Sequence, residues 1–208
     1  MTKNIETTWI YHITDVANLP AIINQGGLYS DISMREMGGP QSDIGYSHIK
    51  ERRAKEIKVD CCGNKFVGEF VPFYYSPRSI MLFIVNQGET GKPRGHQSEV
   101  VHLVSSVASA ISGKSQWAIS DGNAGSHAAQ FSNSLQSLDS LNWDAIQARY
   151  WSDVTFEKQA EFLVADFFPL IAFKGIGCYN DDVTRRVQSM LNASGHSIPV
   201  ATKRDWYY

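Results

Sequence analysis

Short apolar stretches alternate with polar segments along this chain, and their spacing predicts a mixture of strands and helices. The first stretch, Thr8 to Ile13, is rich in β-branched and aromatic residues, which is typical of a strand. Thr14 or Asp15 then provides the cap of a helix, because the following apolar residues recur at helical spacing up to the glycine pair Gly26-Gly27.

The middle of the chain is less regular. Residues 29–48 carry glycine, serine and aspartate without a clear period, which predicts a loop long enough to cover a site. A short helix is expected over residues 47–55. Residues 70–77 have the composition of a strand but contain two prolines, so we expect an edge strand or a broken one. Residues 99–104 and 117–120 are predicted to be strands.

The last third of the chain predicts further short elements. Two short helices are expected within residues 131–150. The pattern over residues 160–168 fits either a helix or a strand, and Pro169 with the apolar run that follows it favours a strand. A strand over 176–179, a helix capped by Asp181-Asp182 and a last short strand over 198–201 complete the prediction. Short strands separated by irregular segments indicate an α+β fold rather than a doubly wound sheet.

Length and composition set limits on this picture. A chain of 208 residues favours one domain over residues 1–208, and 43% hydrophobic residues with 12% aromatics are enough to form a core. The net charge of −2 provides no overall positive field for nucleic acid, so a polyanion would have to be held by a local patch. No glycine-rich dinucleotide motif or phosphate-binding loop motif is present.

Cysteine usage and hydrophobicity bear on where the protein works. The three cysteines are odd in number, and Cys61 and Cys62 are adjacent, which indicates a reducing, cytoplasmic setting. No zinc-ligand spacing is present, so no metal is expected. The first residues lack an apolar signal region and no 18-residue apolar stretch follows, so we expect neither secretion nor a membrane span.

Glu161 is the first candidate for chemistry, because it stands directly before the apolar residues Phe162, Leu163 and Val164. A carboxylate in such a position is expensive to bury without a partner. It could simply be a strand-end residue that faces solvent. Alternatively, it could stabilise positive charge on a ribose ring as a glycosidic bond breaks, as carboxylates do in glycosidases.

Histidine and arginine residues offer further candidates. His12 lies in an apolar strand and could be an ordinary core residue, or it could bind the nicotinamide amide or ribose of NAD together with Ile13 and Thr14. Thr14 equally suits a plain helix cap. In the charged run from Lys50 to Lys58, Arg52 or Arg53 could clamp a pyrophosphate, but adjacent helical residues cannot both face one site.

An aromatic and basic cluster follows the two prolines. Tyr74, Tyr75, Arg78 and Met81 could be edge-strand core, or they could form a platform on which unpaired bases stack, with Arg78 on a phosphate. His127, in a turn rich in small residues, is a candidate contact to a substrate.

Several stretches, taken together and in this order, resemble the DarT family, the DNA ADP-ribosyltransferase toxins of bacterial toxin–antitoxin pairs. Each stretch is weakly specific alone, but the likeness covers nearly the whole chain. The stretches are Ile10–Thr14 with Asn18-Leu19, Ile49–Arg53, Val71–Leu82, His102–Val104, Trp143–Trp151, Gln159–Val164 and Lys203–Tyr208. The pair Cys61-Cys62 is a departure and is given no role.

The resemblance implies an ADP-ribosyltransferase fold, a split antiparallel β core with surrounding helices. It implies NAD as the ADP-ribose donor and a base of single-stranded DNA, thymine in the branch most similar to this chain, as the acceptor. The expected partner is a macrodomain antitoxin of the DarG type. By resemblance, Glu161 and Arg53 are catalytic, NAD is bound by His12, Ile13, Thr14, Ala21, Tyr29 and Arg53, and the DNA lies near Tyr74, Tyr75, Arg78, Met81 and His127.

Two other functions stay open from the residues alone. The chain could be an ADP-ribosyltransferase that acts on RNA or protein, although the aromatic and basic cluster favours a nucleic acid. It could also be an inactive module that binds nucleotide or DNA, against which the joint presence of His12, Arg53 and Glu161 argues.

Overall fold

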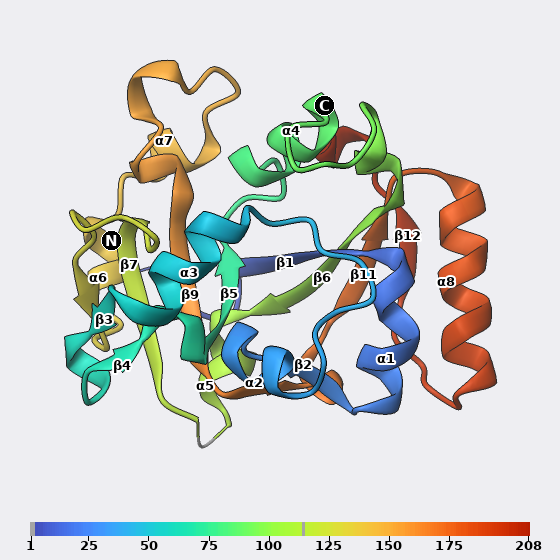
Figure 1. Cartoon of the computed structure of the whole chain (residues 1–208), viewed down its shortest axis with the longest axis horizontal. Helices are drawn as coiled ribbons and strands as arrows, with labels where there is room; N and C mark the ends of the chain where they lie inside the picture. Colours follow the sequence, from blue (N-terminus) through green and yellow to red (C-terminus); the bar gives the residue numbers. More distant parts are fainter. Residues whose placement is uncertain (1–2, 114) are drawn as a thin grey trace.

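The computed structural model of the protein describes residues 3–113 and 115–208, and its centre is an eight-stranded sheet (Figure 1). The strand order is β12-β11-β6-β1-β5-β9-β7-β8, and among the described strands only β11 and β12 pair in parallel. The α+β class and the antiparallel core predicted from the sequence are confirmed. The strands are β1 (Trp9–Asp15), β5 (Phe70–Tyr74), β6 (Val100–Ser106), β7 (Trp117–Asn123), β8 (Phe131–Ser132), β9 (Ala160–Ala165), β11 (Gly175–Cys178) and β12 (Val200–Thr202).

The sheet divides into two halves between β1 and β5. Strand β1 pairs with β6 along its whole length, and β5 pairs with β9 along its whole length. Between β1 and β5, in contrast, the only register pair is Tyr11 with Tyr74. Pro72 lies in the middle of β5 and has no N–H to donate across the gap. Of the two alternatives expected for residues 70–77, the edge strand is wrong, because β5 is an interior strand and Pro72 coincides with the split; the strand ends at Tyr74, before the second proline.

Side chains of one strand alternate between two cores, as the pleat of a strand requires. On β9, Phe162 and Val164 belong to the main core cluster, whereas Leu163 and Ala165 belong to a second cluster on the opposite face. The main cluster is also covered by α8 (Asp181–Ala193), which buries Val183, Val187 and Leu191 as its helical spacing predicts.

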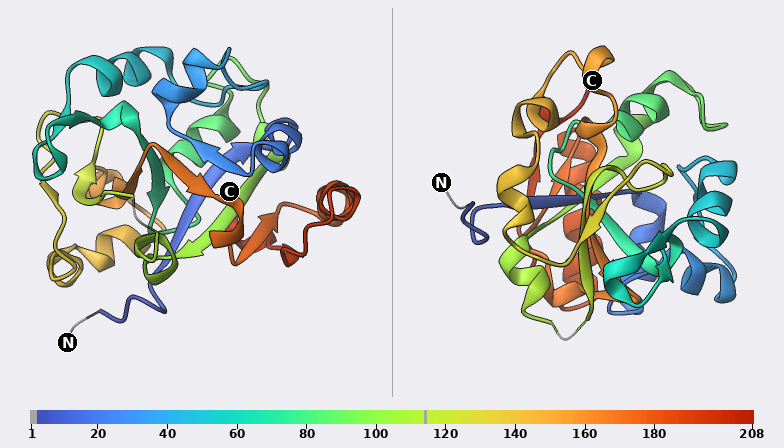
Figure 2. Two further views of the ribbon diagram at one scale, coloured as in Figure 1. Left: turned by 90° about the horizontal axis from the view of Figure 1, so that it is seen from below. Right: turned by 90° about the vertical axis from the view of Figure 1, so that its left-hand side faces the viewer.

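Short helices surround the sheet. In Figure 2, α2, α3 and the segment between them lie on the same side of the sheet. None of the helices in the described ranges has the length and apolar character needed to span a bilayer. Besides α8, the helices are α1 (Leu19–Asn24), α2 (Asp31–Glu36), α3 (Ser47–Lys55), α4 (Ile80–Gln87), α5 (Val107–Ile111), α6 (Ser137–Ser140) and α7 (Trp143–Gln147). Two small strand pairs complete the fold: β2 (Gly27–Tyr29) with β10 (Phe167–Pro169), and β3 (Lys58–Val59) with β4 (Lys65–Phe66).

Three helices, α2, α4 and α5, differ from the sequence prediction. The region 29–48 was expected to be a loop, but it contains α2, whose first turn is capped by the Ser30 hydroxyl. Helix α4 was not predicted; it begins after the cap residue Ser79 and ends at Gly88, which has a φ of 83°. Its sequence is apolar on all sides and thus lacks the periodic pattern by which a helix is recognised.

Candidate active site

Glu161 lies on β9 with the same alternation as Leu163 and Ala165, so its side chain projects to the face that α3 covers. The residue is only 2% exposed. Its backbone N–H donates to the Ser120 hydroxyl at 3.0 Å, and its Oε1 accepts the Ala124 N–H at 3.2 Å. The alternative of a solvent-facing strand end is thereby excluded, since the carboxylate is buried and held at a fixed position.

Arg53, near the end of α3, is the partner that makes this burial possible. Its Nη1 and Nη2 donate to Oε1 and Oε2 of Glu161, both at 2.9 Å, in the bidentate geometry that guanidinium and carboxylate groups favour. Burial alone would lower the pKa of Arg53, but the Glu161 carboxylate outweighs it and the pKa is raised above its ordinary value. Arg53 is therefore a fixed cation.

A cavity of about 450 Å³ opens at the split between β1 and β5, and Glu161 and Arg53 line it. His12 reaches across the split, with Nδ1 2.9 Å from the Pro72 carbonyl oxygen. A carbonyl can only accept, so Nδ1 carries the hydrogen and Nε2 keeps a lone pair. Burial lowers the pKa of His12 to about 4, so the ring is neutral near pH 7.

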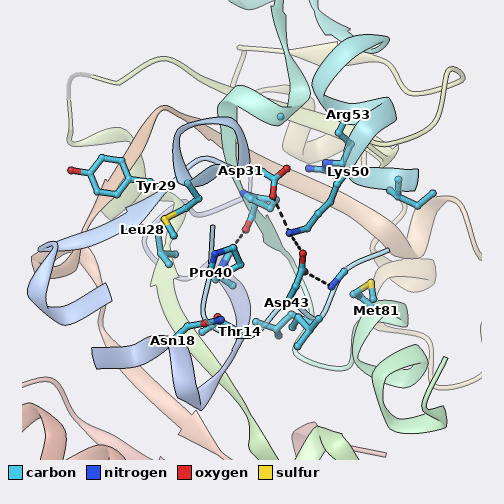
Figure 3. A pocket seen from close by; sticks show the side chains of 18 of the residues that line it. Thr14, Asn18, Leu28, Tyr29, Asp31, Pro40, Asp43, Lys50, Arg53 and Met81 are labelled. Atoms are coloured by element: carbon cyan, nitrogen blue, oxygen red, sulfur yellow. Dashed lines mark hydrogen bonds and ion pairs between the residues drawn. The ribbon is translucent and has the colours of Figure 1, made fainter. Parts of the chain in front are cut away.

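A chain of ion pairs joins α2 and α3 along the lining of the cavity (Figure 3). Lys50 lies 2.9 Å from Asp31 Oδ1 and 2.8 Å from Asp43 Oδ2. Arg35 contacts both Asp31 and Glu51. These pairs tie the segment that follows α2 to the face of α3 that carries Arg53.

The segment between α2 and α3 is also fixed to the end of β1. Asn18 donates to the Thr14 hydroxyl at 3.1 Å and to the Ser42 carbonyl at 2.8 Å, and it accepts the Ser42 N–H at 2.9 Å. Asp15 accepts from the Ser42 hydroxyl and from His96, whose Nε2 lies 2.8 Å away. The wall of the cavity is therefore a hydrogen-bonded unit, not a free loop.

The structure brings most of the predicted site residues together. Those that line the cavity are Glu161, Arg53, His12, Ile13, Thr14, Ala21, Tyr29, Tyr74 and Met81.

Three residues expected near the DNA do not line the cavity. Tyr75 is 3% exposed and packs in the main core, where strand alternation directs it away from the cavity that Tyr74 faces. Arg78 donates to the Tyr207 carbonyl at 2.6 Å and lies over the Tyr208 ring. His127 does not line the cavity; its side chain is 68% exposed and lies 3.3 Å from Glu56.

Several residues of the site escaped the sequence analysis. Lys50 had a signal in the sequence, because it precedes Arg53 by three residues and so shares its face of the helix. The sequence holds no such signal for Asp31 and Asp43, since residues 29–48 show no clear hydrophobic period. Ser120, whose hydroxyl holds the Glu161 backbone, could be identified only from the pairing of β7 with β9. The described side chains form no cluster of three or more potential metal ligands.

A split antiparallel sheet with a histidine, an arginine and a buried glutamate around the split defines the class of ADP-ribosyltransferases. The chain belongs to one family within it: the model of the family described as "ssDNA thymidine ADP-ribosyltransferase, DarT" matches residues 11–208. Among similar curated proteins, the "DNA ADP-ribosyl transferase" of Thermus aquaticus is 36% identical over 203 residues, which cover 97% of this chain and 89% of the relative.

Solved structures agree with this assignment. Thermus sp. 2.9 DarT in complex with ADP-ribosylated ssDNA has a TM-score of 0.91 and 34% identity, and the match covers 100% of both chains. The same protein in complex with NAD+ has a TM-score of 0.87 and 32% identity, with 98% of each chain covered.

Proposed function

We propose that this protein transfers ADP-ribose from NAD to a thymine base of single-stranded DNA. The observation that carries the proposal is the buried, bidentate Arg53–Glu161 pair inside the cavity at the split sheet. The family match supports it, as do the similar solved proteins described in complex with NAD+ and with ADP-ribosylated ssDNA.

NAD is proposed to bind with its nicotinamide end beside β1. The free Nε2 of neutral His12 is an acceptor suited to the N–H of the nicotinamide amide or to a ribose hydroxyl. Ile13 and Thr14 follow His12 along β1 and line the same cavity, as do Ala21 and Tyr29.

Glu161 is proposed to stabilise the transition state. As the bond between the anomeric carbon and nicotinamide breaks, its electron pair leaves with nicotinamide and positive charge develops on the ribose. A carboxylate held in a buried site by Arg53 and the Ala124 N–H needs little reorganisation to meet that charge. The thymine nitrogen then bonds to the anomeric carbon and releases its N–H proton to the surrounding water.

Arg53 is proposed to act as a cation and not as the base for this proton. Its raised pKa and its two hydrogen bonds to Glu161 keep it protonated. In that state it can orient Glu161 and stabilise a developing thymine anion. An Arg53→Lys variant retains the charge but lacks the fork that binds both carboxylate oxygens, so we expect a large loss of rate.

The DNA is proposed to approach past Tyr74 and Met81, which line the cavity, with His127 outside it. Tyr75 and Arg78 would then support this surface from behind. By family membership, the protein is proposed to be the toxin of a cytoplasmic pair whose antitoxin is a macrodomain protein of the DarG type. NAD is consumed as a substrate, and no step requires a metal.

Mass spectrometry of mixed single-stranded oligonucleotides, incubated with NAD and the protein, tests the proposal. We expect an added ADP-ribose on oligonucleotides that contain thymine and none on matched oligonucleotides in which every thymine is replaced. Equal modification of RNA, or modification of protein alone, would contradict the proposed acceptor.

A further inference from the structure

Lys50 is a cation that lines the cavity and is held by the carboxylates of Asp31 and Asp43. Its Nζ lies 2.9 Å from Asp31 Oδ1 and 2.8 Å from Asp43 Oδ2, so it bridges α2 and the segment before α3 (Figure 3). The Asp43 side chain is 48% exposed. A pair this open to water contributes little stability, so Lys50 can exchange this partner at small cost.

The other lysine or arginine among the described lining residues is not available to a ligand in the same way. Arg53 directs both terminal nitrogens at Glu161. Arg52, the alternative considered from the sequence, does not line the cavity. Lys50 shares the cavity-facing side of α3 with Arg53, because the two are three residues apart.

The charges that line the cavity favour such an exchange when NAD enters. Asp31, Asp43 and Glu161 bring three carboxylates to the lining, against the two cations Lys50 and Arg53. The pyrophosphate of NAD adds two negative charges. Phosphate oxygens placed near Asp31 and Asp43 without a cation between them would be repelled.

We infer that Lys50 is the residue that binds the pyrophosphate of NAD, and that it gives up Asp43 to do so. The inference rests on the proposed function and adds a substrate-binding residue to it. The position of Lys50 agrees with this role, since its charge contributes, after burial, to the low pKa of His12 and is therefore within electrostatic reach of the nicotinamide end. A lysine ammonium suits phosphate as a compact charge with three donors.

The competing explanation is that Lys50 has only a structural role, here called a staple: it connects Asp31 on α2 to Asp43 in the segment before α3. The two explanations predict opposite effects for Asp43→Asn. If Lys50 is a staple, removing either end of the pair weakens NAD binding. If Lys50 binds the pyrophosphate, removing the competing charge strengthens it. Asparagine can keep the hydrogen bond that Asp43 Oδ1 accepts from the Gly45 N–H at 2.9 Å.

Isothermal titration of NAD into the wild-type protein and three variants tests the inference. Lys50→Met should weaken NAD binding by at least about tenfold, as expected for a lost charge-assisted contact. Asp43→Asn should strengthen it by a few fold. Lys55→Met is the matched control, because Lys55 is on the same helix, is 73% exposed and does not line the cavity. The affinity of this variant for NAD should stay within a factor of about two of the wild-type value.

Weaker NAD binding by both Lys50→Met and Asp43→Asn would overturn the inference in favour of the staple, and unchanged binding by Lys50→Met would overturn it outright. Circular dichroism checks that each variant is folded. Should Lys50→Met not fold, Lys50→Gln and the sign of the Asp43→Asn effect decide. A wild-type protein that binds no NAD would contradict the proposed function itself, and the inference with it.

Discussion

At the scale of single residues, the site depends on polar groups that are buried and yet fully partnered. Arg53 and Glu161 satisfy each other, and the Ala124 N–H adds to Glu161. Removing one member of such a pair leaves the other charge buried without a partner, which typically lowers the free energy of unfolding by about 3–5 kcal/mol. Glu161→Gln also leaves the Arg53 charge without its counterion, but it fills the same space and keeps one acceptor oxygen, so it disturbs the site less than a truncation does.

Buried neutral histidines make the fold sensitive to acid. Burial lowers the pKa of both His12 and His102 to about 4. The unfolded chain, with histidine pKa values near about 6.5, binds more protons between these limits, so stability falls as pH drops through that window. We expect a loss of at most about 2 kcal/mol per histidine between pH 7 and pH 5.

Denaturant unfolding at the two pH values checks this prediction. His12→Gln should lose less stability on acidification than the wild type, whereas the exposed His196→Gln should lose as much. Equal acid sensitivity of wild type and His12→Gln would contradict a neutral His12.

At the scale of elements, the position of α3 decides the site, because this helix carries Arg53 and Lys50. Gly68 lies beneath it: a Cβ added there would be 2.9 Å from the Ala54 Cα and 3.2 Å from the Ala54 nitrogen. These are backbone atoms, so the helix would have to move. Gly68→Ala should therefore destabilise by about 1–3 kcal/mol and lower transfer activity.

Thermal unfolding and a transfer assay measure both effects of Gly68→Ala. Gly113→Ala is the control, since a Cβ there meets nothing closer than 3.8 Å. An active Gly68→Ala protein with an unchanged melting temperature would show that α3 tolerates displacement.

The start of α4 is held by the end of the chain. Tyr208 donates its hydroxyl to the carbonyls of Arg78 and Ser79, and Arg78 donates to Tyr207 and lies 4.4 Å from the Tyr208 ring centroid. This arrangement positions Met81 at the cavity. Arg78→Met should cost about 1–3 kcal/mol of stability while changing affinity for single-stranded DNA little.

Unfolding curves and DNA titrations separate the two roles of Arg78. Arg185→Met, on the exposed face of α8 with a side chain 71% exposed, is the control for loss of an arginine. A large loss of DNA affinity at unchanged stability would indicate instead that Arg78 contacts a phosphate of the DNA, as the sequence suggested.

Comparison of sequence and structure at this scale shows what local pattern can reveal. The strand before Thr14, the helix over residues 47–55 and the amphipathic α8 were predictable because their periods are local. The interior place of β5 was not, because Pro72 is tolerated there only by the split, which is a property of the assembled sheet. Likewise, the separation of Tyr74 from Tyr75 follows from strand alternation, whereas the support of Glu161 by Ser120 depends on pairing between distant strands.

At the scale of the whole molecule, recognition of DNA is expected to be local. The net charge is −2, and the described cavity lining offers only two lysine or arginine side chains, one of them paired with Glu161. A protein that contacts few phosphates releases few counterions. The slope of log K against log salt for single-stranded DNA should therefore be shallower than about −2.

Fluorescence titrations between low and moderate salt measure this slope, with duplex of the same sequence as the comparison. A slope steeper than about −4, or tighter binding of the duplex, would indicate that DNA binds a broad basic surface, which would contradict local recognition.

The central claim is that Glu161, fixed by Arg53, stabilises the ribose cation as nicotinamide leaves. The most direct test is single-turnover transfer of ADP-ribose to a thymine oligonucleotide by Glu161→Gln, with NAD affinity measured on the same protein. We expect a rate lower by at least about 10²-fold, with NAD still bound. A near-normal rate would contradict the claim, since glutamine has nearly the same shape but lacks the negative charge and keeps only one of the two oxygens that accept from Arg53.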